Sequence, residues 1–284
     1  MPAIGLLGDV MLGRSVGDTL RDEPAAELWS EELRSLCASL DLMICNLECC
    51  VSERGERTRR IPGKPFFFRA PPAAVAALQS IHVRAVSLAN NHALDYEEEA
   101  LADTLGLLSD GGVAAAGAGR GAEAARRPVV VEAGGVRIGL LCVSDHPHEY
   151  AAGPVRYGIA HADLERGLPD WLLDQLGRLH ERCELAIVFA HWGPNMSAAP
   201  SPWQRRAAAA FQDAGADLVA GHSAHVFHGI EWKAGGPVLF DLGDALDDYH
   251  VDPVLHNDLG VLAIWRPGAG DDELELVGLK LAYC

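Results

Sequence analysis

Two histidines, His222 and His225, lie in the sequence Gly221-His222-Ser223-Ala224-His225, directly after a short apolar segment. Residues 216–220 are expected to form a buried strand, so both imidazoles should stand on the turn at its end. Neutral imidazole is the commonest protein ligand for transition metals. Because such ions take roughly four to six ligands, this pair needs partners from elsewhere in the chain.

Further candidate ligands stand where other apolar segments end. They are Asp9, Glu48, Asn91 with His92, and His191. The carboxyl ends of strands in an open α/β sheet meet at one edge, which would bring these side chains together. Carboxylate, amide and imidazole groups together suit Mn, Fe or Zn, with Mg as a further candidate.

The number of candidate ligands exceeds the needs of one ion, and a carboxylate can bridge two. The set therefore predicts two divalent ions about 3.5–4 Å apart. Such a pair generates a hydroxide nucleophile near neutral pH and binds the phosphoryl or carbonyl oxygen that is attacked. His222 and His225 on their own are equally compatible with hydrogen-bonded loop histidines, and the four partner segments favour ligands.

The segments that must position these residues alternate between strand and helix patterns. Strands are expected at 2–8, 41–45, 83–88, 113–117, 129–132, 136–143, 185–190, 216–220, 229–233, 237–241, 259–265 and 274–282. Helices are expected at 25–40, 72–80, 96–110, 161–182 and 202–214, with long loops at 51–71 and 144–160. Alternation followed by strands predicts an α/β fold with a mixed sheet, or two sheets packed between helices.

The composition describes a globular chain of one domain. Its 284 residues are 49% hydrophobic and 22% charged, with no internal repeat or low-complexity linker, so we expect a single domain over 1–284. No apolar segment has membrane-spanning length. The first seven residues lack the basic start and long apolar stretch of a signal peptide, which predicts a cytoplasmic protein.

The formal net charge of −17 argues against sequence-independent binding to nucleic acid or to an anionic membrane. A small anionic or peptide-like substrate remains compatible, because bound metal ions invert the local potential. The seven cysteines show no Cys-x-x-Cys spacing and lie mostly in apolar segments, so we expect buried free thiols in a reducing compartment. The sequence leaves the oligomeric state open.

Five segments together resemble the successive motifs of the CapA-type poly-γ-glutamate capsule-synthesis family. They are Gly8–Arg14 (GDVMLGR), Asn46–Glu48 (NLE), Ala89–Asp95 (ANNHALD), His191–Gly193 (HWG) and Gly221–His225 (GHSAH). Their order matches that of the family, and five ordered motifs are far more specific than one. The resemblance implies the fold of calcineurin-like metallophosphoesterases, a four-layer αββα sandwich with a dinuclear metal centre.

The resemblance also implies a role for each matched metal ligand. Asp9 and His225 would hold one ion, Asn91, His191 and His222 would hold the second, and Glu48 would bridge them. Two departures stand out. Met11 occupies the position where metallophosphoesterases usually have a histidine, so the first ion is expected to bind weakly, carry more water or be absent. The acidic segment 241–252 replaces a Gly-Asn-type loop.

The same resemblance implies the catalytic groups. His92 would protonate the leaving group, and Arg14 would contact an anionic group of the substrate. Asp95 either orients His92 or caps the helix expected at 96–110. The basic residues of loop 51–71 form either a solvated surface or a lid that recruits phosphate or carboxylate groups.

These observations favour a metal-dependent hydrolase that uses a metal-activated water on a phosphoester or a γ-glutamyl-like amide. One alternative is a non-catalytic component of polyglutamate or cell-envelope assembly that keeps the fold and holds its metals loosely. Another is a metal-dependent tailoring enzyme that acts on an amino acid or peptide.

Overall fold

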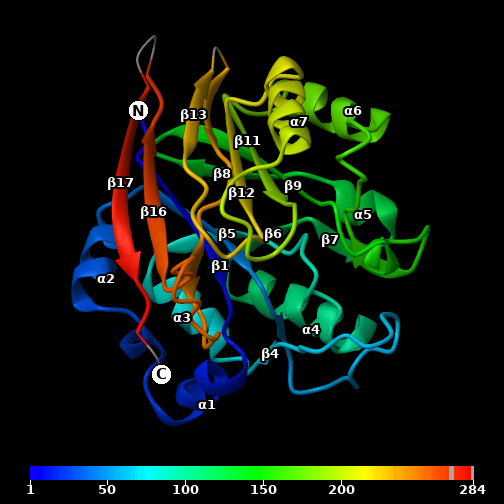
Figure 1. Cartoon of the computed structure of the whole chain (residues 1–284), viewed down its shortest axis with the longest axis vertical. Coiled ribbons are helices and arrows are strands. Elements are labelled where there is room, and N and C mark those ends of the chain that lie inside the picture. The colour runs from blue at the N-terminus through cyan, green and yellow to red at the C-terminus, as the bar shows by residue number, and fades with distance from the viewer. Residues whose placement is uncertain (234, 269–271, 283–284) are drawn as a thin grey trace.

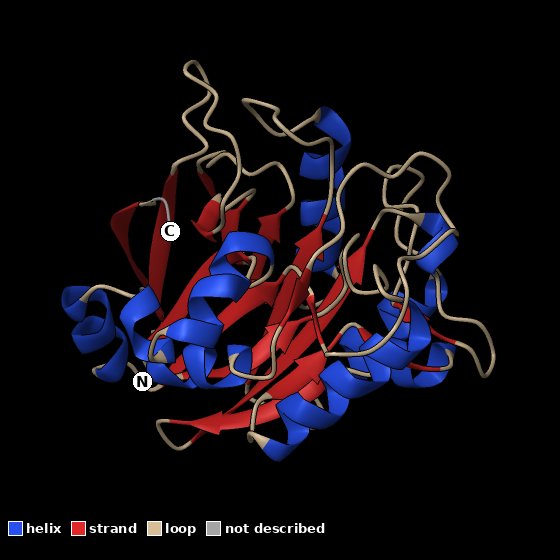
Figure 2. Ribbon diagram, turned by 90° about the horizontal axis from the view of Figure 1, so that it is seen from below, coloured by secondary structure: helices blue, strands red, loops and turns tan. Residues whose placement is uncertain are grey.

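Two β-sheets lie face to face, and helices cover the outer face of each, as Figures 1 and 2 show. The structure is a computed structural model that describes residues 1–233, 235–268 and 272–282. The order of its layers is helices, sheet, sheet, helices. The α/β class and the four-layer αββα sandwich expected from the sequence are therefore confirmed.

The first sheet has β1 at its centre, in the order β17-β16-β1-β2-β5-β6, and short β15 also pairs with β1. Strands β1, β2, β5, β6 and β15 are parallel, whereas β16 runs antiparallel to β1 and β17 runs antiparallel to β16. Their bounds are β1 Ile4–Val10, β2 Leu42–Leu47, β5 Val83–Ser87, β6 Ala114–Ala116, β15 Asp244–Leu246, β16 Leu259–Arg266 and β17 Glu273–Lys280.

The second sheet follows the order β13-β14-β12-β11-β9-β8, with parallel central strands and antiparallel edges. Its strands are β8 Val129–Ala133, β9 Val136–Ser144, β11 Leu185–His191, β12 Leu218–His222, β13 Ile230–Lys233 and β14 Gly236–Leu239. Two small ribbons complete the strands: β3 Cys50–Val51 with β4 Arg69–Ala70, and β7 Ala118–Arg120 with β10 Tyr157–Ile159.

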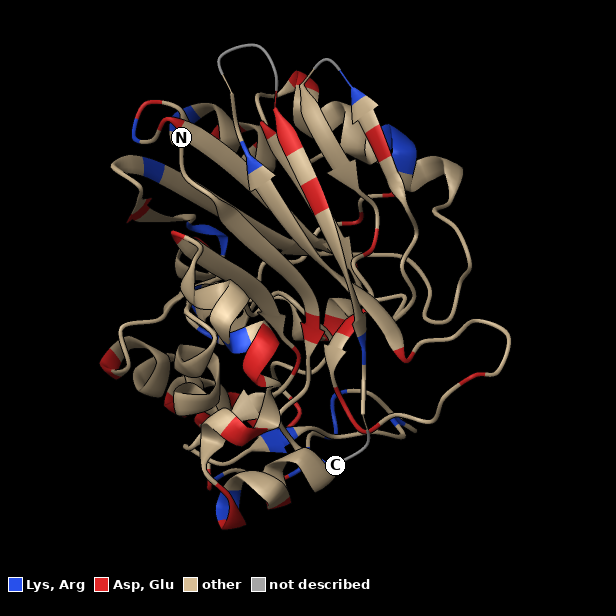
Figure 3. Ribbon diagram, turned by 90° about the vertical axis from the view of Figure 1, so that its left-hand side faces the viewer, with Lys and Arg blue, Asp and Glu red and all other residues tan. Residues whose placement is uncertain are grey.

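Helices on the first-sheet side are α1 Arg14–Asp22, α2 Glu31–Ala38, α3 Ala74–Ser80 and α4 Glu97–Asp110. Helices α6 Asp170–Leu179 and α7 Pro202–Asp213 cover the second sheet, α5 Ala122–Arg126 packs on β7, and 3-10 turns occur at Ala25–Leu28 and His148–Tyr150. Acidic positions outnumber basic ones on the ribbon, in keeping with the net charge (Figure 3).

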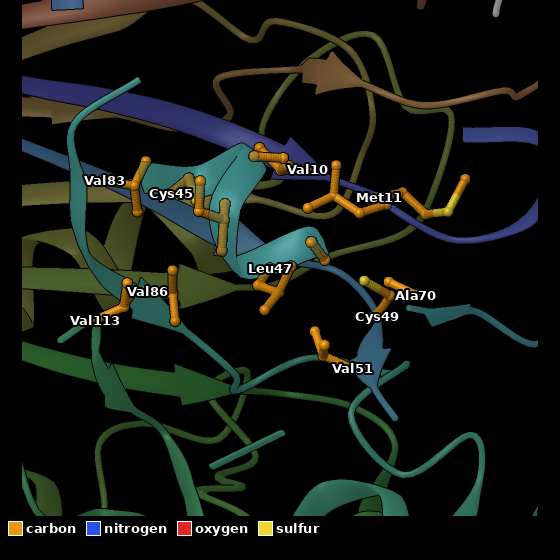
Figure 4. Packing of buried hydrophobic residues seen from close by; sticks show 14 of the residues in the cluster. Val10, Met11, Cys45, Leu47, Cys49, Val51, Ala70, Val83, Val86 and Val113 are labelled. Carbon is orange, nitrogen blue, oxygen red and sulfur yellow. The ribbon is translucent and has the colours of Figure 1, made fainter. Parts of the chain in front are cut away.

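Three clusters of buried apolar side chains hold the layers together. The alternation along β1 explains the division, because Ile4 and Leu6 face the second sheet whereas Leu7 faces the helices, and an irregularity at Asp9 turns Val10 to the helix side as well. Figure 4 shows part of the helix-side cluster of the first sheet. A third cluster joins the second sheet to α6 and α7.

Most expected elements are present, and the differences have local causes. The helix expected at 25–40 is interrupted at Ser30, whose Oγ accepts a hydrogen bond from the Leu33 N–H at 3.2 Å and so starts α2 anew. The helix expected at 161–182 begins only at Asp170, after Pro169. Six cysteines are free and buried as predicted, and Cys284 lies outside the described residues.

Strand β15 reaches β1 through a close backbone approach. A side chain on Gly8 would place its Cβ only 1.9 Å from the carbonyl oxygen of Gly243, and one on Gly260 would lie 2.0 Å from that of Asp244. The Asp9 N–H donates to the Gly243 carbonyl at 3.1 Å, and the Met11 N–H to that of Leu246 at 2.8 Å. Glycine at these positions therefore lets β15 lie beside the end of β1.

We expect Gly8→Ala to lower the free energy of unfolding by about 3 kcal/mol, because the new methyl group meets a backbone carbonyl that cannot rotate away. The matched control is Gly106→Ala in α4, where a new Cβ meets nothing within 4 Å. That change should stabilise the helix by about 0.5–1 kcal/mol. Urea denaturation of both variants checks this, and equal stability of Gly8→Ala and wild type would contradict the close approach.

Candidate metal centre

The candidate site lies where the carboxyl ends of the central strands of both sheets meet. On the first sheet, Asp9 is in register with Asn46 of β2 and with Asp244 of β15. On the second sheet, His191 of β11 is in register with His222 of β12. A hydrogen bond from the Ser223 N–H to Asp9 Oδ2, at 3.1 Å, joins the two edges.

Asp9 stands between two groups of potential ligands. Its Oδ1 lies 3.2 Å from His222 Nδ1, and its Oδ2 lies 3.3 Å from His225 Nδ1. The Asn46 amide donates to Oδ1 at 2.7 Å and fixes the plane of the carboxylate. Although burial opposes ionisation, hydrogen bonds with His222 and His225 hold the pKa of Asp9 well below its ordinary value.

The first ligand group consists of Asp9, Glu48 and His225. His225 Nδ1 lies 4.0 Å from Glu48 Oε2 and 2.8 Å from Asp244 Oδ1. Burial raises the pKa of Glu48 well above its ordinary value, and the charge of Asp9 adds to this. Burial opposes protonation of His225, but Asp244 and Glu48 hold the pKa of His225 well above its ordinary value.

The second ligand group consists of Asp9, His191 and His222. The Nδ1 atoms of His191 and His222 lie 2.9 Å apart. Burial, followed by the neighbouring His222, lowers the pKa of His191 well below its ordinary value, which keeps this imidazole neutral and able to donate a lone pair. Both imidazoles are fully buried.

Asn91 was expected to complete the second group. Its Oδ1 is buried and has no hydrogen-bond partner within the described parts of the chain, while its carbonyl oxygen accepts from Lys64 Nζ at 2.8 Å. An unpaired buried amide oxygen is what an unfilled ligand position would leave.

The grouping of the side chains makes Asp9 a second candidate for the bridging position, beside the predicted Glu48. Glu48 was expected to bridge the two ions, with Asp9 on one of them. In the structure Asp9 belongs to both groups, and Glu48 belongs to the His225 group. The reason is the orientation of Asp9, whose two oxygens face different imidazoles.

The residues fit divalent cations. Glu48 Oε1 and the Nε2 atoms of His191 and His222 are buried and have no hydrogen-bond partner in the described residues. Buried carboxylates without partners are costly, and positive charge placed among them removes that cost. Carboxylate and imidazole donors are the ligand types that Mn, Fe and Zn accept.

His92 and Asp95 form a buried pair beside the ligands. His92 Nδ1 lies 2.6 Å from Asp95 Oδ2, and the His92 ring stacks on Phe68 with centroids 3.9 Å apart. Asp95 also accepts from the Phe68 N–H at 2.7 Å and pairs with Lys64 Nζ at 3.2 Å. The N-terminal cap of α4 is Tyr96 and no side-chain capping bond is present there, so the contacts of Asp95 favour the interpretation that it orients His92.

Arg14 lies at the partly exposed rim of this region. Its Nε is 3.3 Å from Asp248 Oδ1, and its guanidinium lies 5.8 Å from the centre of the Phe68 ring. The basic residues of loop 51–71 are mostly engaged elsewhere. Arg54 pairs with Glu99 and Asp103, and Arg60 pairs with Glu97 and Glu98. These pairs fasten the loop to α4, which favours the surface-loop interpretation over the lid.

Sequence reasoning missed several supporting residues. Asn90 donates to Asn46 Oδ1 at 3.0 Å, and Tyr249 donates to Glu48 Oε2 at 3.0 Å. Asp244, 2.8 Å from His225, was noted only as part of an acidic segment. The available signal for Asp244 was its place in the segment that replaces a Gly-Asn-type loop, whereas nothing local pointed to Tyr249.

Comparison with known proteins identifies the family. The model of the bacterial capsule synthesis protein PGA_cap matches residues 3–249. The chain belongs to this family. A probable polyglutamine synthesis accessory protein of Mycobacterium tuberculosis is 34% identical over 229 residues, which cover 78% of this chain and 60% of that protein. The PGA biosynthesis protein CapA of Bacillus subtilis is 26% identical, over 85% of this chain and 62% of its own.

This PGA_cap family member spans about three fifths of the length of these relatives. Among solved structures, a hypothetical protein from Thermus thermophilus superposes with a TM-score of 0.58 at 14% identity, covering 98% of this chain and 99% of that one. The NAD nucleotidase of Haemophilus influenzae superposes with a TM-score of 0.55 at 9% identity, over 98% of this chain and 50% of its own. These neighbours support the metallophosphoesterase-like fold.

Within the described residues, no helix combines the length and apolar character needed to cross a bilayer.

We expect metal uptake to release protons and to tighten as the pH rises. The metal-free protein holds protons on Glu48 and His225 at pH values above their ordinary pKa, and a cation must displace them. Calorimetric titration with Mn²⁺ in two buffers of different ionisation heat measures this release. Glu48→Gln should release fewer protons, and equal heats in both buffers for the wild-type protein would contradict the prediction.

Proposed function

We propose that this PGA_cap family member is a metal-dependent hydrolase with a dinuclear centre, which cleaves a phosphoester or a γ-glutamyl-like amide. The observation that carries the proposal is the shared Asp9, which joins two buried ligand groups. The His92–Asp95 pair is connected to them through Phe68, which stacks on His92 and on Tyr249, the residue that donates to Glu48. When bound, two divalent ions at such groups lower the pKa of a water molecule and stabilise developing negative charge.

His92 is proposed as the group that delivers a proton to the leaving group. Its Nδ1 is engaged by Asp95 at 2.6 Å, which leaves Nε2 as the nitrogen that can exchange a proton with a substrate. Stacking on Phe68 and the near-complete burial of the ring restrict its orientation. Asp95, held in turn by Lys64 and the Phe68 N–H, acts as a positioning residue.

Arg14 is proposed to contact an anionic part of the substrate. Its side chain is 41% exposed, and its link to Asp248 holds the guanidinium near Phe68 and therefore on the side of His92. Arginine binds both phosphate and carboxylate in a bidentate manner, so this residue suits either proposed substrate class.

Different relatives support the two proposed substrate classes. The names of the curated relatives refer to PGA or polyglutamine synthesis and favour the amide. The nucleotidase among the structural neighbours favours the phosphoester. Six buried free thiols suit a reducing compartment, and we propose a cytoplasmic location on that ground.

A second candidate function is a non-catalytic component of polyglutamate or cell-envelope assembly. The observation that favours it is Met11, which is fully buried among apolar side chains and offers no imidazole to the first ligand group. A protein of this kind would bind metal without hydrolysing phosphoesters or γ-glutamyl amides.

The proton-delivery role of His92 predicts a dependence on the leaving group. His92→Asn should reduce turnover by roughly 10²–10⁴-fold for alkyl or phenyl esters, whose leaving groups need a proton, and much less for nitrophenyl esters. Mn²⁺ content should remain at the wild-type value. The matched control is the exposed His148, whose replacement by Asn should leave turnover unchanged.

The screen uses Mn²⁺-loaded protein with aryl phosphodiesters and γ-glutamyl anilides of graded leaving-group acidity. His222→Ala should lose both metal and turnover, since His222 lies in a ligand group. A wild-type protein that carries two ions and cleaves none of these compounds would reject the hydrolase and favour the assembly component.

A further inference from the structure

The first ligand group lacks the imidazole that a histidine at position 11 would supply. Met11 is fully buried, and Figure 4 shows it in the cluster that includes Val10, Leu47 and Cys49. Its Sδ accepts a hydrogen bond from the Gly13 N–H at 3.1 Å. A thioether is a soft donor that suits Mn or Mg poorly. Met11 is therefore part of the core and leaves Asp9, Glu48 and His225 as the group.

Asp244 lies beside this group from another strand. Strand β15 pairs in parallel with β1 and brings Asp244 into register with Asp9. Its Oδ1 is 2.8 Å from His225 Nδ1, and its side chain is fully buried. Its second oxygen, Oδ2, is also buried, accepts no hydrogen bond from an N–H group of the described residues, and neighbours the buried carboxyl group of Asp247.

The ring nitrogen of His225 that a carboxylate contacts distinguishes a metal ligand from a residue that only orients the histidine. A carboxylate that only orients a metal-binding histidine contacts the ring nitrogen turned away from the metal. Here Asp244 contacts Nδ1, and the same nitrogen faces Asp9 at 3.3 Å and Glu48 at 4.0 Å. The opposite nitrogen, Nε2, lies 3.3 Å from the Asn195 amide. Asp244 thus shares the ring nitrogen that also faces Asp9 and Glu48, although it lies just outside the close grouping of Asp9, Glu48 and His225.

Two other carboxylates of the acidic segment already have structural partners. Asp241 accepts from the Ala224 N–H at 2.8 Å and from the Gly243 N–H at 2.9 Å. Asp248 accepts from the Ser15 hydroxyl at 2.7 Å and pairs with Arg14. Asp244 differs from both because its 2.8 Å contact is with a candidate ligand, His225.

We propose that Asp244 is a direct ligand of the ion held by Asp9, Glu48 and His225, and that it supplies the coordination that Met11 cannot. The inference rests on the proposed dinuclear centre. It makes the first position rich in oxygen, with three carboxylates and one imidazole, and leaves the second rich in nitrogen. Oxygen-rich sites suit Mn²⁺ or Mg²⁺, whereas imidazole-rich sites suit Zn²⁺ or Fe²⁺.

The test is calorimetric titration of the full chain with Mn²⁺, comparing wild type, Asp244→Ala and the matched control Asp248→Ala. Wild type should bind two equivalents. Asp244→Ala should weaken one equivalent at least about 100-fold, since outer-sphere changes alone already cost 10–100-fold. In Asp244→Ala, the affinity of the other site for Mn²⁺ should stay within about threefold of the wild-type value. In Asp248→Ala, the affinities of both sites should do so, because threefold is less than the smallest outer-sphere effect.

A spectroscopic measurement separates a ligand from a positioning residue. A lost ligand is replaced by water, so Mn²⁺ in Asp244→Ala should show stronger deuterium modulation in D₂O by pulsed electron paramagnetic resonance than in wild type. Asp244→Asn keeps the shape of the side chain and one oxygen, so it should weaken the same site by a smaller factor. It serves as the second variant where the alanine protein does not fold.

The outcomes are distinguishable. The ligand role of Asp244 would be overturned if both Asp244 variants bound two Mn²⁺ ions with wild-type affinities, or if the deuterium modulation in Asp244→Ala equalled that of wild type. Either result would leave the hydrolase proposal intact. Loss of one site in a wild-type protein that hydrolyses nothing would support the ligand and reject the hydrolase. A wild-type protein that takes up no Mn²⁺ would overturn both.

Discussion

The arrangement of the whole site depends on the carboxylate of Asp9. It is 1% exposed and sits at the end of the central strand of the first sheet. Its two oxygens face His222 and His225, which come from the second sheet, and it also accepts hydrogen bonds from Asn46 and the Ser223 N–H. One side chain therefore fixes how the edges of the two sheets meet, and the apolar core between the sheets keeps that relation rigid.

Charge is concentrated at this meeting point in a way that the metal-free protein can only partly balance. Asp9, Glu48 and Asp244 are buried together, and His225 brings a positive charge close to them when it is protonated. Burial raises the pKa of Asp244 well above its ordinary value, so protons take the place of cations there. Such a cluster does little for stability, and its persistence is best explained by ligand binding.

The sequence was sufficient wherever a candidate residue followed a locally recognisable strand. Asp9, His191 and His222 end apolar segments whose burial pattern is strong, and parallel strands bring such ends together. The four-layer order itself came from motif resemblance, because alternation of strands and helices left one sheet and two sheets equally open. Helix α1 escaped prediction because it combines a buried stripe of Val16 and Leu20 with an otherwise polar sequence.

Asp244 and Asp95 illustrate what the sequence could not provide. Strand β15 has only three residues, and its pairing with β1 spans most of the chain through glycines whose close contacts are visible only in three dimensions. Asp95 offered two local roles, and the choice depended on the Phe68 N–H and Lys64, which arrive from a distant loop. In both cases the deciding contact is non-local, which pattern reasoning does not reach.

The two ligand groups around Asp9 are chemically unequal, and that inequality bears on how the site would work. One group gathers carboxylates around a single imidazole, whereas the other gathers two imidazoles, one of them held neutral by burial. An ion among carboxylates retains less positive charge to polarise a substrate than one among neutral nitrogens. The His92–Asp95 pair follows β5 of the first sheet, the sheet that supplies the carboxylates. In the proposed hydrolase, the nitrogen-rich group would therefore hold the stronger electrophile, and His92, which directly follows Asn91, would supply the proton.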